Sequence, residues 1–141
     1  MDRSLFIAQS LLAAALLAVH YVAFQHDLYW HYLWLDIPMH FLGGFWAALV
    51  TVWFLRRTPL PLSFMNVLVG VVCISIAWEI MEWLIGFQRE TNHFVDTSID
   101  LAMDLFGGAL GFALARAVTG PAHEHTSAPH APGSAQSTDG A

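Results

Sequence analysis

The sequence predicts an all-helical integral membrane protein, a bundle of four membrane-spanning helices with a disordered C-terminal tail. Hydrophobic residues make up 57% of its 141 positions and charged residues only 11%, against about 25% in soluble domains. A soluble protein of this size could not cover its surface with so few charges. Four apolar stretches also approach or exceed the roughly 17–25 residues that a helix needs to span a bilayer. The length fits one domain.

The four predicted spans are residues 4–24, 38–55, 62–86 and 97–118. The first follows Arg3 as a signal peptide would, but its apolar run exceeds the usual h-region of about 7–15 residues. Ala18-Val-His-Tyr21 is also a poor cleavage site, so we expect a retained span. Pro59 and Pro61 end the helices in the turn between the second and third spans. The fourth span begins with Thr97-Ser-Ile-Asp100, a capping-box pattern typical of a helix start.

The composition changes abruptly at Gly120. Residues 1–119 form the predicted helical domain, whereas residues 120–141 are rich in Gly, Pro, Ser, Ala and His, cannot bury a core and should be a disordered tail. The tail contains three histidines, typical either of a solvated segment or of one that captures metal: His123, His125 and His130.

The placement of arginine predicts the orientation. Arg3, Arg56, Arg57 and Arg116 would lie on one side of a four-span protein, and only Arg89 on the other. The positive-inside rule then puts both termini in the cytoplasm. The external loops would be residues 25–37 and 87–96. The first loop holds four aromatic residues, typical of a belt at the headgroup level or, alternatively, of a lipid-binding lip: Tyr29, Trp30, Tyr32 and Trp34.

Charge and cysteine content exclude some functions. The formal net charge is -6, with five arginines and no lysine, so the chain has no basic patch to bind nucleic acid. Membrane lipid is the expected surrounding, and another membrane protein is a second candidate partner. The single Cys73 excludes an intrachain disulfide. It is typical of a small buried hydrophobic residue.

Apart from Arg116, at the inner end of the fourth span, the charged residues inside the predicted spans all lie at one depth. At 1.5 Å per residue, the five of them lie within roughly 10 Å of the outer boundary, where each is costly unless it faces a protein interior or a wet cavity. These residues are His40, Glu79, Glu82, Asp100 and Asp104. Three more polar residues lie at or just above that depth and would support them: His20, His93 and Asp96.

The charged residues also share helix faces with small residues. Positions three and four apart lie on one face of a helix, and small residues let helix backbones approach closely. We therefore expect three stripes to face one another, with the carboxylates in a pocket that opens outward. The stripes are Ser75, Glu79, Glu82 and Gly86; Asp100, Asp104, Gly107, Gly108 and Gly111; and His40, Gly43, Gly44, Ala47 and Thr51.

Four carboxylates in one pocket cannot all stay ionised without a counter-charge, so either some are protonated or a cation neutralises them. Carboxylate with imidazole suits Mn, Fe or Zn, whereas oxygen ligands alone suit Mg or Ca. The predicted ligands of a divalent metal are His40, Glu79, Glu82, Asp100 and Asp104. Structural roles remain as alternatives: Asp100 in the capping box, His20 in a hydrogen bond at the headgroup level, His40 at its helix start, and the deepest carboxylates as polar contacts between helices.

One ordered pattern resembles a known family. It runs His40-Phe-Leu-Gly43-Gly, Trp78-Glu79-Ile-Met-Glu82-Trp83, then Asp96-Thr97-Ser-Ile-Asp100 with Asp104 and a glycine-rich finish. It resembles the YjdF-like family of inner-membrane proteins and, more distantly, VanZ-like membrane proteins. Val95 stands where the family motif has Trp. The resemblance implies an all-helical, multi-pass protein of the bacterial inner membrane, and it implies no particular activity.

Three functions fit these observations. The first is a metal-dependent membrane enzyme that acts on an envelope or lipid substrate. The second is an ion or proton conduit, in which the carboxylates relay a cation. The third is a non-catalytic subunit that binds another membrane protein. A conduit needs polar groups on both sides of the membrane, and below Asp104 and Ser75 only Thr51 and Asn66 interrupt the small and apolar residues. The pattern therefore favours an enzyme over a conduit.

Overall fold

The computed structural model describes residues 2–87 and 92–119, and these residues contain helices and no strand. The helices are α1 (Asp2–Gln25), α2 (Leu28–His31), the 3-10 turn η1 (Leu33–Leu35), α3 (Asp36–Leu55), α4 (Phe64–Ile85) and α5 (His93–Thr119). Four of them, α1, α3, α4 and α5, are long and apolar enough to cross a membrane. The fold prediction is thus confirmed. Arg89 and the predicted tail, with its three histidines, lie outside the described residues.

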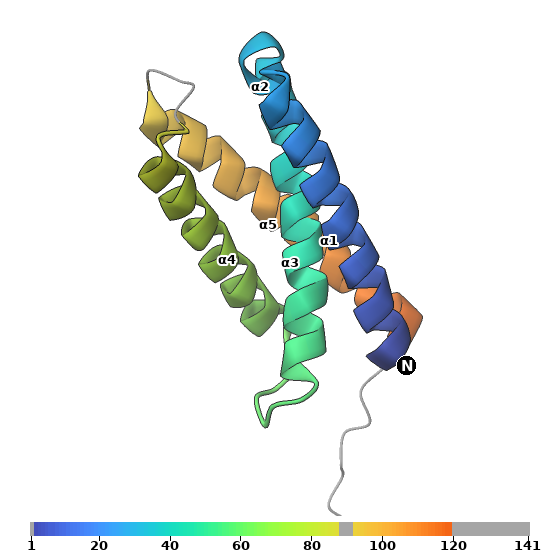
Figure 1. The fold of residues 1–141 in the computed structure, drawn as a ribbon. Helices are drawn as coiled ribbons and strands as arrows, with labels where there is room; N and C mark the ends of the chain where they lie inside the picture. Colours follow the sequence, from blue (N-terminus) through green and yellow to red (C-terminus); the bar gives the residue numbers. More distant parts are fainter. Residues whose placement is uncertain (1, 88–91, 120–141) are drawn as a thin grey trace, which may run out of the picture.

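The helices run alternately up and down, and α3 and α5 form the closest pair (Figure 1). Glycines make this approach possible. A Cβ added to Gly44 would meet the backbone of Asp104, and one added to Gly107 would meet the carbonyl oxygen of Phe41. The two backbones therefore touch, as small-residue packing between membrane helices allows. The predicted packing of the glycine stripes is confirmed for α3 and α5, whereas a Cβ added to Gly86, in the stripe on α4, would meet nothing within 4 Å.

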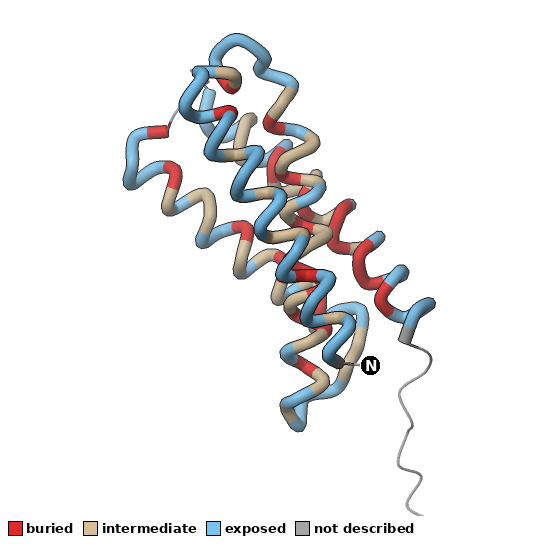
Figure 2. The backbone as a smooth tube through the Cα atoms, turned by 45° about the vertical axis from the view of Figure 1, so that its right-hand side comes forward, coloured by how far each residue is buried: buried red, intermediate tan, exposed pale blue. Residues whose placement is uncertain are grey.

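The half of the bundle away from α2 has an apolar core. Helices α3, α4 and α5 form it, and buried positions concentrate on these helices in Figure 2. The core residues are Ala47, Ala48, Leu49, Val52, Leu55, Val67, Val71, Phe112 and Ala115. Helix α1 packs on α3 and α2, and only 6% of its apolar window is buried. It is the most peripheral helix and the one most exposed to lipid.

Two helices begin earlier than the sequence predicted. Helix α3 begins at Asp36, so Pro38 is its third residue. A proline fits there because backbone N–H groups of the first turn have no partner within the helix. Helix α5 begins at His93, after Asn92 accepts a 3.4 Å hydrogen bond from the backbone N–H of Val95. The capping-box interpretation of Thr97 is therefore wrong, since Thr97 lies inside α5.

Helix α4 has the termini that its sequence indicates. Ser63 caps its start by accepting a hydrogen bond from the N–H of Asn66 at 3.1 Å, and Gly86 ends it with φ 72°, the left-handed conformation that glycine adopts readily.

Two side-chain predictions are wrong, namely that Cys73 is buried and that Tyr29 belongs to a belt of aromatic residues at the headgroup level. Cys73 is exposed on the outer face of α4, where the surrounding lipid accepts an apolar thiol. Tyr29 is 1% exposed because its ring packs against Phe87.

Candidate metal centre

A cluster of charged side chains lies near the end of the bundle where α1 and α4 finish and α3 and α5 begin. At its centre is His40, in the second turn of α3, which is 5% exposed. Carboxylates from three helices surround it, so the structure brings the predicted set together and adds Asp36: Asp36 of α3, Glu79 and Glu82 of α4, and Asp100 and Asp104 of α5.

The two ring nitrogens of His40 have different neighbours. Nδ1 lies 3.2 Å from Oδ2 of Asp104, across the contact between α3 and α5. An ionised carboxylate only accepts hydrogen bonds, so in the neutral ring we assign the proton to Nδ1 and the lone pair to Nε2. Around Nε2 lie three carboxylate oxygens, Oδ1 of Asp36 and of Asp100 at 3.8 Å and Oε1 of Glu79 at 4.0 Å.

The separations around Nε2 suit metal ligands, in two groups that share His40. The ligand atoms of Asp36, His40 and Asp100 all lie within 4.8 Å of one another, and so do those of His40, Glu79 and Glu82. The separations around Nε2 are too long for hydrogen bonds. Ligand atoms that each lie about 2.1 Å from one ion are themselves ~3–4 Å apart in tetrahedral or octahedral geometry. Asp104 also fits, because most metal-binding histidines donate their other N–H to a carboxylate or carbonyl that orients the ring. Asp104 would thus hold His40 in position rather than bind the ion.

Glu79 has one satisfied oxygen and one that lacks a hydrogen bond. Its Oε2 accepts a hydrogen bond from the hydroxyl of Thr97 at 2.7 Å. Its Oε1 is buried, has no hydrogen-bond partner and lies beside Nε2 of His40. A buried polar atom without a partner is costly unless something binds it. The early start of α5 is what brings Thr97 within reach of Glu79.

Glu82 lies at the edge of the cluster. It is buried, and its Oε1 accepts a 2.9 Å hydrogen bond from the indole N–H of Trp78, one turn earlier on α4. It lies close enough to His40 and Glu79 for the three to share an ion. Both glutamates accept one hydrogen bond from a neutral donor, but only Glu79 also has a buried oxygen without a partner among the described residues.

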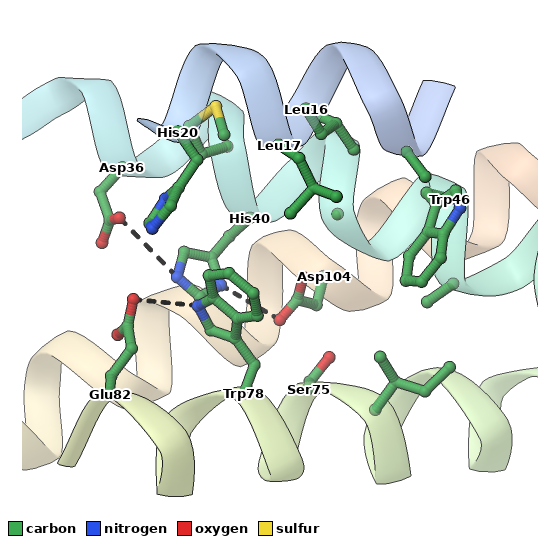
Figure 3. Close-up of a pocket in the computed structure, with 15 residues that line it drawn as sticks. Leu16, Leu17, His20, Asp36, His40, Trp46, Ser75, Trp78, Glu82 and Asp104 are labelled. Atoms are coloured by element: carbon green, nitrogen blue, oxygen red, sulfur yellow. Dashed lines mark hydrogen bonds and ion pairs between the residues drawn. The ribbon is translucent and has the colours of Figure 1, made fainter. Parts of the chain in front are cut away.

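The cluster borders a cavity of about 200 Å³. Figure 3 shows that α1 and α4 form its two walls, with Leu17 and His20 on one and Ser75, Trp78 and Glu82 on the other. Asp36, His40 and Asp104 close the charged end. Helix α3 lines the cavity between these walls. Further along, the lining is mostly apolar, with Leu16 from α1 and Trp46 from α3. The charged site therefore opens onto a space large enough for part of another molecule.

The three supporting residues lie at different distances from the ligands. His20 lines the cavity, and its Nδ1 lies 2.9 Å from the hydroxyl of Tyr29. Asp96 is in the first turn of α5, and exposed His93 begins that helix. Both line a smaller pocket of about 60 Å³ above Glu79 and Glu82. His20 thus belongs to the cavity, and His93 and Asp96 to its outer rim.

Sequence reasoning missed Asp36 and the hydrogen-bond donors. Asp36 was placed in a loop, although its spacing of four residues from His40 would have put both on one helix face. Trp78 has the same spacing from Glu82. The partnership of Thr97 with Glu79 had no sequence signal, because it depends on how α4 and α5 pack.

The charge of the cluster has little compensation within the described residues. Apart from histidines, the candidates for a counter-charge would be arginines, and the described ones lie at the opposite end of the bundle: Arg3, Arg56, Arg57 and Arg116. In a low-dielectric surrounding, buried carboxylates without a counter-charge are strongly disfavoured. A cation or protons must therefore complete the site.

Comparison with known proteins supports the class of the protein. A family model described as "Predicted membrane protein (DUF2238)" matches residues 4–120. The chain belongs to this family. It is the YjdF-like family that the motif resembled, so that resemblance is confirmed. No curated protein and no solved structure matches the chain. Any function of the charged site must therefore be argued from its geometry.

Proposed function

We propose that the protein is a metal-dependent membrane enzyme, with a divalent ion held inside the bilayer by Asp36, His40, Glu79 and Asp100. The observation that carries this proposal is the surroundings of His40 Nε2, where three carboxylate oxygens lie at 3.8–4.0 Å. The buried Oε1 of Glu79, which has no hydrogen bond, supports it further. Imidazole with carboxylates favours Mn, Fe or Zn over Ca.

A catalytic role is favoured over a purely structural one because the site adjoins the cavity. Structural metal sites are closed by protein ligands, whereas catalytic sites keep a position for substrate. A divalent ion here would act as a Lewis acid that polarises a carbonyl or phosphoryl oxygen. Three carboxylates border the cavity. Since Asp36 would be a ligand and Asp104 orients His40, we assign acid–base chemistry to Glu82.

The packing gives less support to the other two functions. A conduit needs polar groups along the whole bundle, but the described core beyond Thr51 is the apolar cluster of α3, α4 and α5. The hydroxyl of Thr51 is itself bonded to the carbonyl of Ala47. A non-catalytic subunit needs no cavity beside its charged residues, so it leaves that feature unexplained.

The distribution of the arginines supports an orientation in which the site lies near the outer side of the membrane. The four that lie at the end opposite His40 favour an orientation with both termini in the cytoplasm. We therefore propose that the site faces the outer side of a bacterial inner membrane, where it would meet lipids or envelope components.

Metal analysis of the detergent-purified protein tests the proposal. The wild type should carry a stoichiometric transition metal, and Glu79→Gln and His40→Gln should lose most of it because each removes a ligand. His26→Gln is the matched control, since His26 is exposed at the end of α1 and should not affect the metal. Equal metal content in the wild type and both ligand variants, at equal thermal stability, would exclude the metal centre.

A further inference from the structure

We infer that the cavity between α1 and α4 binds a lipid from the surrounding bilayer, with one hydrocarbon chain in its apolar part and an uncharged or cationic head at His40. The inference rests on the proposed function, because it names the class of substrate that the site would receive. It follows from the position of the cavity, the polarity of its walls and the charge at its end.

The cavity is accessible from the side, through lipid. Its two walls, α1 and α4, each pack on α3, and within residues 2–87 and 92–119 they share no comparable interface with each other. Figure 1 shows α3 between them. Leu17 lines the cavity and is also 62% exposed, so it lies on the rim where the cavity meets the bilayer. A molecule dissolved in lipid can enter there without crossing water.

The walls change from charged to apolar along the bundle axis. Ala13 lies seven residues before His20 on α1, and Ala47 lies seven residues after His40 on α3. At 1.5 Å per residue, the apolar part extends ~10 Å inward from the charged end. An apolar cavity of about 150 Å³ can stay dry and take up apolar ligands. A cavity of about 200 Å³ therefore accommodates part of a hydrocarbon chain.

The charged end selects the head group. Five carboxylates lie within the cluster, and one divalent ion with one histidine does not neutralise them. The described arginines, which would pair with a phosphate, lie at the other end of the bundle. A head with a net negative charge would be repelled, whereas a hydroxyl, ester or amine would be accepted. Ester and amide carbonyls are also groups that a Lewis acid polarises.

Photolabelling in lipid nanodiscs tests the inference. The probe is a monoacylglycerol with a diazirine at the end of its chain, with the same chain on lysophosphatidic acid as the anionic comparison. We expect saturable labelling of the cavity walls near Ala13 and Ile74, competed by unlabelled monoacylglycerol, and severalfold less labelling by the anionic probe. Equal or stronger labelling by the anionic probe would overturn the head-group assignment.

Two filled-cavity variants and one control complete the test. Ala13→Phe on α1 and Ile74→Trp on α4 place larger side chains in the cavity from opposite walls, so each should reduce saturable labelling severalfold. Ala14→Phe, one residue along on the exposed face of α1, should label like the wild type. Labelling that persists in both cavity variants, or that falls only on lipid-facing positions such as Leu11 and Val19, would overturn the inference.

Metal content measured on the same samples separates this inference from the proposed function. Metal retained in Ala13→Phe, with labelling lost, is the expected result. A wild type that labels in the cavity but carries no metal would refute the metal centre and leave the lipid site supported. A wild type that carries metal but shows no saturable labelling would refute the lipid site alone.

Discussion

Nδ1 of His40 and Oδ2 of Asp104, two residues 64 positions apart in the sequence, lie 3.2 Å apart and join α3 to α5. The bond lies directly beside the glycine contact between α3 and α5, since the backbone of Asp104 is what a Cβ on Gly44 would strike. The closest helix contact of the bundle and the orientation of its central histidine therefore depend on the same residue.

Asp104→Asn should weaken metal binding without abolishing it. The amide keeps the size of the side chain but no longer fixes the His40 proton on Nδ1, and loss of such a partner typically costs about 10–100-fold in metal affinity. Metal titration of the purified variant measures this. Asp27→Asn is a suitable control because Asp27 is exposed and has a positive φ of 54°, which asparagine tolerates. An unchanged affinity would show that His40 needs no partner.

Thr97→Val should lower metal affinity, whereas Thr97→Ser should not. Valine has the shape of threonine but cannot donate to Oε2 of Glu79, so the ligand carboxylate loses the 2.7 Å hydrogen bond that Thr97 donates. Serine keeps the hydroxyl. Competition with a chelator would rank the two variants, and identical behaviour of valine and serine would mean that Thr97 does not position Glu79.

Glu82→Gln should keep the metal. Its carboxylate oxygen already accepts a hydrogen bond from Trp78, and glutamine retains that acceptor. Elemental analysis measures the metal content of Glu82→Gln and compares it with that of Glu79→Gln, the same substitution one turn earlier on α4. If Glu82→Gln loses metal as fully as Glu79→Gln, then Glu82 is a ligand, and the acid–base role must be assigned elsewhere.

Gly107→Ala should destabilise the protein more than Gly108→Ala, and Leu110→Ala should have the smallest effect. A methyl at Gly107 would strike the backbone of α3, whereas one at Gly108 meets only the side chain of Val71. Overpacking typically costs about 1–3 kcal/mol. Leu110 is 53% exposed, so its truncation exchanges one lipid-facing surface for a smaller one. Thermal melting in detergent gives the order, and a Gly107→Ala variant as stable as the wild type would contradict it.

Reporter fusions after Thr119 and at Asn92 should report opposite sides of the membrane, with Thr119 in the cytoplasm. Four arginines at one end of the bundle set this expectation. The two fusions control for each other, because a reporter that is merely inactive would not give the complementary pattern. A periplasmic signal after Thr119 would invert the protein and turn the site toward the cytoplasm.

The sequence was sufficient to predict the four long helices and the helix faces that pack against one another. Depth and spacing identified His40 with Glu79, Glu82, Asp100 and Asp104, because charge inside a membrane helix must face protein. Helix starts were the weak point. Pro38 was expected to begin α3, but it is the third residue of a helix that begins at Asp36. Thr97 was expected to begin α5, but that helix begins at His93, after Asn92. The early start of α3 hid Asp36, which lies four residues before His40 on the same helix. The role of Thr97 depends on the packing of α4 against α5, which spacing along one helix does not reveal.

The backbone contact between α3 and α5 also bears on how the protein is made. Helix α3 enters the membrane with Asp36 and His40 before α5 has been synthesised. Helix α5 then brings Asp100 and Asp104, each costing ~2.5–3.5 kcal/mol at a helix centre. Because Gly44 and Gly107 let the backbones touch, the new helix can dock on α3 as it enters and pair Asp104 with His40 at once. Insertion of the last helix and assembly of the site thus become one step of biogenesis, and a chain that cannot close this contact would leave α5 outside the bilayer as a target for proteolysis.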